Sequence, residues 1–129
     1  MTIRVRGVGT HGAYPHMGVD PVLAASQIVV SLQSMVGRDI NPLEGAVISV
    51  GSIHGGVKSN IIPEEVELQM TGRSNNPAVR TRLLDGIDRV ARGTALALGV
   101  PVVQCAATRP STGSGLAALE RSGRCSRDR

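Results

Sequence analysis

Two histidines on a short loop are the residues of this chain best suited to chemistry. His11 and His16 lie within residues 9–21, a segment rich in glycine and proline between a strand-like opening and a helix start. Loops between regular elements often carry binding and catalytic groups, and an imidazole can donate a hydrogen bond or carry charge near neutral pH. Zinc binding is the other chemistry open to this pair. However, no carboxylate lies between the histidines, Asp20 is better used as a helix N-cap, and two protein ligands would leave a zinc site incomplete.

Two further polar residues occupy similar settings downstream. Asn60 precedes an Ile-Ile-Pro sequence at residues 61–63, and Arg73 ends a Thr-Gly-Arg triplet. Considered alone, the first is an ordinary turn asparagine before a proline, and the second is an ordinary solvated arginine. Tyr14, the only Phe, Tyr or Trp in the sequence, either contacts a substrate or packs the loop.

The histidine loop, the segment around Asn60 and the triplet that ends at Arg73 resemble, in this order, the dimerisation (lid) domain of the metal-dependent amidohydrolases and peptidases. That family includes hippurate hydrolase, N-acyl-amino-acid amidohydrolase and auxin-conjugate hydrolase, and the resemblance covers residues 3–103. It implies that His11, within the sequence His-Gly-Ala-Tyr-Pro-His, enters the partner subunit's active site and donates to the scissile carbonyl oxygen as this becomes an oxyanion. It also implies that Asn60 lies near the substrate and that Arg73 pairs with the free carboxylate of an N-acyl amino acid. Relatives usually have a bulkier residue than Gly72 before the arginine, which leaves the aim of Arg73 open.

The same resemblance implies a catalytic centre of two divalent metals, zinc or manganese, in which a glutamate activates the bridging water. The sequence has no His-x-Asp pair and no Glu-Glu pair in a plausible ligand loop. We therefore expect this chain to bind no metal and no cofactor, and to be inactive without a missing catalytic domain. The implied function is the dimerisation and lid part of an amidohydrolase that cleaves small N-acyl amino acids. The alternative is a stand-alone ferredoxin-like module that binds a small ligand or regulates a partner.

Hydrophobic periodicity predicts the strands that must position these residues. Alternation or a run of β-branched residues indicates strands over residues 2–7, 46–53 and 65–71, and a fourth strand begins at residues 101–103.

Two helices separate these strands. A helix over 21–36 and another over 77–98 each follow a capping side chain and begin with proline, and Gly37 and Gly99 are the expected helix ends. The element order is therefore βαββαβ. This order predicts an α+β, ferredoxin-like fold, in which a four-stranded antiparallel sheet carries both helices on one face.

The composition argues against several classes of function. The net charge of +4 arises mainly after residue 107, where five arginines outnumber two acids, and no basic patch with aromatics suits nucleic acid. No segment reaches the roughly 18 apolar residues of a membrane span, so we expect neither nucleic-acid nor membrane partners. The two cysteines, Cys105 and Cys125, form no disulfide framework, so we expect a reducing, cytoplasmic setting. Residues 1–107 are predicted to form the domain. Residues 108–129, rich in Ser, Gly, Ala and Arg, are predicted to be a disordered, low-complexity tail.

Strand 46–53 falls on an edge of the expected sheet and carries neither charge nor proline to discourage pairing. Helix 21–36 also has almost no charge. Both features predict a homodimer through this strand and this helix, and the family resemblance implies the same.

Overall fold

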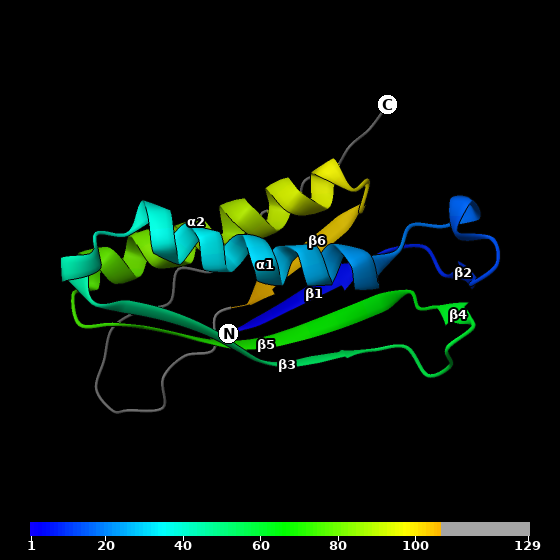
Figure 1. The fold of residues 1–129 in the computed structure, drawn as a ribbon, viewed down its shortest axis with the longest axis horizontal. Helices are drawn as coiled ribbons and strands as arrows, with labels where there is room; N and C mark the ends of the chain where they lie inside the picture. The colour runs from blue at the N-terminus through cyan, green and yellow to red at the C-terminus, as the bar shows by residue number, and fades with distance from the viewer. Residues whose placement is uncertain (107–129) are drawn as a thin grey trace.

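Four antiparallel strands and two helices form the body of the protein. The computed structural model describes residues 1–106, and the tail predicted over 108–129 lies outside them. The strands of the main sheet, in the spatial order β3-β5-β1-β6, are β1 (Thr2–Arg6), β3 (Ala46–Gly55), β5 (Glu65–Ser74) and β6 (Val102–Ala106). Helices α1 (Pro21–Asp39) and α2 (Pro77–Ala97) cover one face of this sheet (Figure 1). The predicted ferredoxin-like fold is confirmed, with the strand at 46–53 on an edge.

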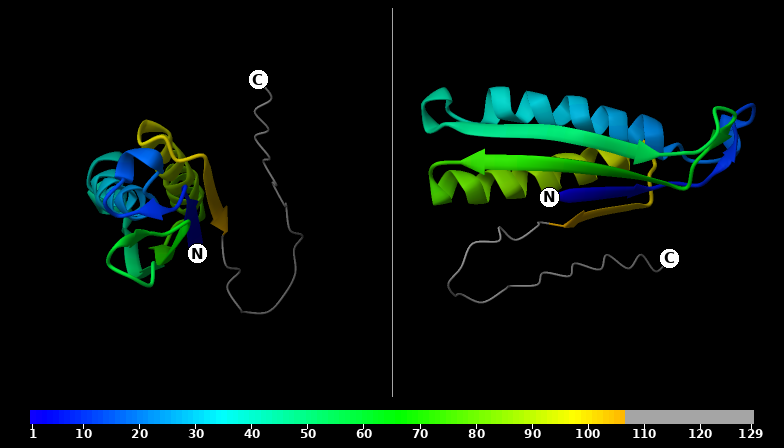
Figure 2. Two further views of the ribbon diagram at one scale, coloured as in Figure 1. Left: turned by 90° about the vertical axis from the view of Figure 1, so that its right-hand side faces the viewer. Right: turned by 90° about the horizontal axis from the view of Figure 1, so that it is seen from below.

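A second, very small sheet was not predicted. In it β2 (Thr10–His11) pairs antiparallel with β4 (Ile61–Ile62). This pair projects beyond one end of the main sheet (Figures 1 and 2). We call the two segments that carry it, residues 8–19 and 56–64, the arm. Two single-turn 3-10 helices complete the secondary structure of residues 1–106: η1 (Pro15–Met17) and η2 (Pro42–Glu44).

One aliphatic core fills the space between the sheet and the helices. Val66, Leu68 and Met70 alternate onto the inner face of β5, as their period-two spacing predicts. They pack against fully buried residues of both helices, such as Ile28 and Ile87. Within residues 1–106, neither helix combines the length and the apolar character that crossing a membrane requires.

Both predicted helix starts are confirmed. The Asp20 carboxylate accepts the N–H groups of Val22 and Leu23 at 2.8 and 3.2 Å. The side-chain oxygen of Asn76 accepts the N–H of Ala78 at 2.9 Å. Each cap therefore satisfies backbone donors that the first helical turn leaves unpaired.

The predicted end of the first helix at Gly37 is wrong, whereas Gly99 does follow the second helix. Gly99 has a φ of 72°, the left-handed conformation that commonly terminates a helix. Gly37 lies inside α1, which continues to Asp39. The helix ends where Ile40 becomes extended, with φ −110° and ψ 130°, and buries its side chain. Asn41 then precedes a proline, which disfavours further helical conformation.

The apolar stripe of α1 divides into two rows. Ile28 and Leu32 face the core and are fully buried. Val22, Val29 and Val36, spaced seven residues apart, lie on a flank of the helix; Val22 is 41% exposed and the other two are half-buried. The first and last of these line cavities whose other walls include residues of β3. We call these three residues the valine row, and it lies beside the free edge of the sheet.

Candidate functional site

The arm is fixed at its base by backbone contacts. Val8 and Val19 exchange two backbone hydrogen bonds, of 2.9 and 3.0 Å, which close the histidine loop. A Cβ atom on Gly7 would lie 2.1 Å from the Val19 carbonyl oxygen, and one on Gly18 would lie 2.4 Å from that of Val8. These close approaches therefore require glycine at positions 7 and 18. The Gly7 N–H, directly before the first segment of the arm, also donates to the carbonyl oxygen of Glu64, at the end of the second segment, at 2.9 Å.

Strands β2 and β4 bring His11 beside the segment that carries Asn60. His11 is the register partner of Ile61, and the N–H of Gly12 donates to the carbonyl oxygen of Asn60 at 2.8 Å. The side chains of His11 and Asn60 are both exposed. Two of the predicted site residues, far apart in the sequence, therefore share one arm.

The ring of His11 has two close neighbours within its own loop. Its Nδ1 accepts the N–H of Ala13 at 3.0 Å, and its centroid lies 5.8 Å from that of the Tyr14 ring. The Tyr14 ring also lies 6.3 Å from the His16 ring, edge to face, yet Tyr14 is 55% exposed. Tyr14 thus packs against both histidines and keeps a surface free for a ligand. The hydrogen bond from Ala13 was not predictable from the sequence, because its donor is a backbone amide that every residue except proline carries.

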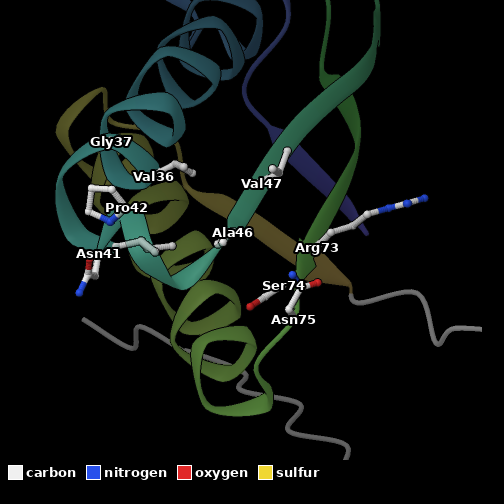
Figure 3. A pocket seen from close by; sticks show the side chains of 11 residues that line it. Val36, Gly37, Asn41, Pro42, Ala46, Val47, Arg73, Ser74 and Asn75 are labelled. Carbon is white, nitrogen blue, oxygen red and sulfur yellow. The ribbon is translucent and has the colours of Figure 1, made fainter.

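Arg73 lies at the opposite end of the main sheet. It is exposed and stands opposite Val47 in the register of β5 with β3. From Glu65, which adjoins the arm, β5 extends to Arg73, a distance of about 26 Å at about 3.3 Å per residue. Arg73 is one of the residues that line a cavity of about 440 Å³ between the end of α1, the start of β3 and the end of β5, and Figure 3 shows its side chain pointing away from the other lining residues. One chain therefore does not bring Arg73 to His11 and Asn60.

The open face of the sheet carries paired charges. Arg4 contacts Glu67 at 2.9 Å, and Arg6 pairs with Glu65. Hydrogen bonds from Gln69 and Arg4 hold the pKa of Glu67 below its ordinary value. The arginines are exposed and the glutamates are partly exposed, so the pairs contribute little to stability. Both carboxylates already have cationic partners.

The described residues offer hydrogen bonds and charge rather than a metal centre or a reactive thiol. Among residues 1–106, no three His, Cys, Asp or Glu side chains lie close enough together to hold a metal ion. Burial and, after it, the neighbouring Asp88 raise the pKa of the Cys105 thiol to about 12. Its nucleophilic thiolate form is therefore scarce at neutral pH.

Comparison with known sequences gives the arrangement a context. Residues 1–97 match the family described as the peptidase dimerisation domain. N-acetyldiaminopimelate deacetylase of Leuconostoc mesenteroides is 38% identical over 102 residues, which cover 79% of this chain and 27% of that enzyme. N-acetyl-L-cysteine deacetylase of Bacillus subtilis is 42% identical over 81 residues, which cover 63% of this chain and 20% of that enzyme. The chain thus spans about a quarter of the length of the curated relatives that it matches.

Solved structures share the fold. An aminohydrolase candidate from methicillin-resistant Staphylococcus aureus superposes with a TM-score of 0.75 at 32% identity, over 80% of this chain and 28% of that one. The aminobenzoyl-glutamate utilization protein of Klebsiella pneumoniae superposes with a TM-score of 0.71 at 20% identity, over 80% of this chain and 25% of that one. At the lower identity, the likeness concerns the fold alone.

Proposed function

The chain belongs to the peptidase dimerisation domain family, and from this premise we propose that it is the dimerisation and substrate-lid part of a metal-dependent amidohydrolase. The resemblance recognised in the sequence is thereby confirmed at the level of the family. The match over residues 1–97 is the observation that carries the proposal. The relatives named above are deacetylases of N-acetyldiaminopimelate and N-acetyl-L-cysteine, which supports small N-acyl amino acids as the substrate class.

His11 is the catalytic residue of this proposal. It is exposed on an arm that projects beyond the sheet, where it could enter the active site of a neighbouring subunit. There its ring N–H would donate to the scissile carbonyl oxygen as negative charge develops on it. One preorganised donor of this kind contributes about 3–4 kcal/mol to lowering the barrier. Asn60, on the same arm, and Tyr14, beside the histidine ring, would line the substrate.

A pair of divalent metals, zinc or manganese, would activate the attacking water in the complete enzyme. The described residues do not fit such a centre, because no three potential ligands lie together among them. We therefore place the metals in a catalytic domain outside this sequence. The present chain would supply hydrogen bonds, shape and the dimer contact. We call the complete protein, this chain joined to that catalytic domain, the parent enzyme.

Self-association through α1 and β3 is the second part of the proposal. Strand β3 is an edge of the sheet, and its Val47 and Ile53 side chains are 56% and 50% exposed. The valine row of α1 extends this apolar edge. Pairing with a second copy about a two-fold axis would bury both features and remove the free strand edge.

The same two-fold axis would bring Arg73 to the arm of the neighbouring subunit. In an antiparallel pair of β3 strands, the Ala46 end of one strand lies opposite the Gly55 end of the other. Arg73 lies beside the Ala46 end, whereas the arm continues from the Gly55 end. Arg73 of one subunit would therefore approach His11 and Asn60 of the other. One substrate could then have its carbonyl oxygen at the arm and its carboxylate at the arginine.

Mixed dimers of the parent enzyme test this arrangement. His11→Ala and Arg73→Ala proteins are purified separately, mixed and allowed to exchange subunits. If each site takes His11 from one subunit and Arg73 from the other, every heterodimer keeps one intact site, and mixing should restore about a quarter of wild-type activity. A mixture that exchanges subunits but regains no activity would show that both residues serve a site from the same subunit. Mixing each variant with wild-type protein is the control.

The 129-residue chain alone should not hydrolyse N-acyl amino acids, because the proposed metal centre lies elsewhere. The measurement compares this chain with the parent enzyme on N-acetyl amino acids in the presence of added Mn²⁺ or Zn²⁺. Metal-dependent turnover by the chain alone would contradict the proposal. Equal inactivity of both proteins, with a small ligand bound by the chain, would favour the stand-alone module.

A further inference from the structure

The turn that follows His11 holds both the backbone and the ring of this residue. The Tyr14 N–H donates to the His11 carbonyl oxygen at 2.8 Å, and the Ala13 N–H donates to the His11 Nδ1 at 3.0 Å. The pairing of His11 with Ile61 fixes the backbone on the other side of the turn. The ring is exposed, so its orientation is set by these local contacts rather than by burial.

The contact at Nδ1 has a chemical consequence. A backbone N–H can only donate, so the ring nitrogen opposite it must present a lone pair. The proton of the neutral ring then resides on Nε2, which lies across the ring from the contact with the loop. A doubly protonated ring would set its Nδ1–H against the Ala13 N–H and would lose this hydrogen bond.

We infer that the Ala13 amide is a positioning group that holds His11 as the neutral tautomer with its proton on Nε2. This inference rests on the proposed function, in which His11 donates to the carbonyl oxygen of the substrate. A neutral ring with an outward Nε2–H can stabilise an oxyanion by hydrogen bonding without giving up its proton. The same arrangement removes His11 as a metal ligand, because one ring nitrogen is engaged and the other carries the proton.

His16 provides an internal comparison. It lies on the same loop, is exposed and contacts the same Tyr14 ring. Within residues 1–106, however, neither of its ring nitrogens has a hydrogen-bond partner. Its two neutral tautomers should therefore interconvert as they do in water.

Nitrogen-15 NMR of the 129-residue chain tests the inference directly. At about pH 8.5, well above the ordinary range of imidazole, His11 should show an unprotonated Nδ1 and a protonated Nε2, while His16 shows averaged shifts. A scalar coupling through the hydrogen bond should join the Ala13 amide nitrogen to the His11 Nδ1. The Gly12 N–H, which binds the Asn60 carbonyl oxygen, reports separately on the pairing of β2 with β4.

Two substitutions at one position separate the amide from the side chain. Ala13→Gly keeps the N–H and should keep both the coupling and the tautomer. Ala13→Pro removes the N–H and should give His11 the averaged shifts of His16, with the Gly12 contact as the check that β2 and β4 still pair. Wild-type protein with a protonated Nδ1, or without the coupling at about pH 8.5, would overturn the inference whatever the variants do. Because these readouts need no turnover, an error in the catalytic role of His11 would leave them unchanged and would be detected separately by kinetics.

Discussion

His11 owes its position to residues with little or no side chain. Gly7 and Gly18 permit the contact at the base of the arm, and a Cβ atom on Gly12 would lie 3.1 Å from the Asn60 carbonyl oxygen. None of the residues of the arm is buried, so backbone hydrogen bonds supply most of its order. A segment held in this way opens locally at low cost. We therefore expect the arm to be most ordered when another domain or subunit covers it.

Replacing the histidine in the parent enzyme should affect catalysis rather than substrate binding. His11→Ala should lower kcat roughly 10²–10³-fold and change KM little, because the contact strengthens only as the oxyanion develops. Steady-state kinetics on an N-acetyl amino acid give both constants, and His16→Ala, on the same loop, is the control. An unchanged kcat with a raised KM would mean that His11 only positions the substrate.

At the scale of elements, the sequence predicts regular structure well where a pattern repeats. The alternation in β5 and the two cap-plus-proline helix starts were among the patterns that gave the element order, and this order predicted the fold. The pairing of β2 with β4 was not predictable, because two-residue strands carry no periodicity. Gly37 and Gly99 look alike in the sequence, but only Gly99 has the positive φ that ends a helix. The first helix ends instead at Ile40, which is extended and buries its side chain in the core.

The sequence nominates the residues of the candidate site but does not predict how they lie relative to one another. His11, Asn60 and Arg73 were identified by their segments, and pairing between β2 and β4 places the first two together. Arg73 lies at the far end of β5 from His11 and Asn60, and no local sequence pattern predicts this separation. The same holds for α1, because the spacing of its apolar residues does not distinguish the buried residues from those of the valine row.

Alanine substitutions at two helical glycines should have different effects on stability. A Cβ atom on Gly37 would meet no atom within 4 Å, so Gly37→Ala should raise the free energy of unfolding by roughly 0.5–1 kcal/mol. A Cβ atom on Gly86 would lie 2.5 Å from the Met35 sulfur, so Gly86→Ala should show no such gain, because Met35 must move. Urea unfolding of both variants provides the measurement. A loss of stability in Gly37→Ala would restore this glycine as the helix end.

At the scale of the molecule, charge is distributed unevenly over the surface. The open face of the sheet bears paired arginines and glutamates, and α2 bears further ion pairs, of Arg89 with Asp39 and Arg92 with Asp88. The flank formed by β3 and the valine row lacks comparable pairs among the described residues and exposes aliphatic side chains instead. Such a flank is better suited to another apolar surface than to water.

Lysine substitutions on this flank should therefore weaken the proposed dimer. Val47→Lys on β3 and Val22→Lys on α1 replace side chains that are 56% and 41% exposed, so both variants should still fold. A two-fold axis brings every substitution into the contact twice, and like charges there cost several kcal/mol, so the dimer dissociation constant should rise roughly tenfold or more.

Val30→Lys is the control, because this side chain is 63% exposed and is not part of the valine row. Lysine at Ile48, which is 6% exposed, would test folding rather than association. Sedimentation at micromolar concentration is the measurement. A monomeric wild-type chain, or flank variants that dissociate no more than Val30→Lys, would exclude this surface as the dimer contact.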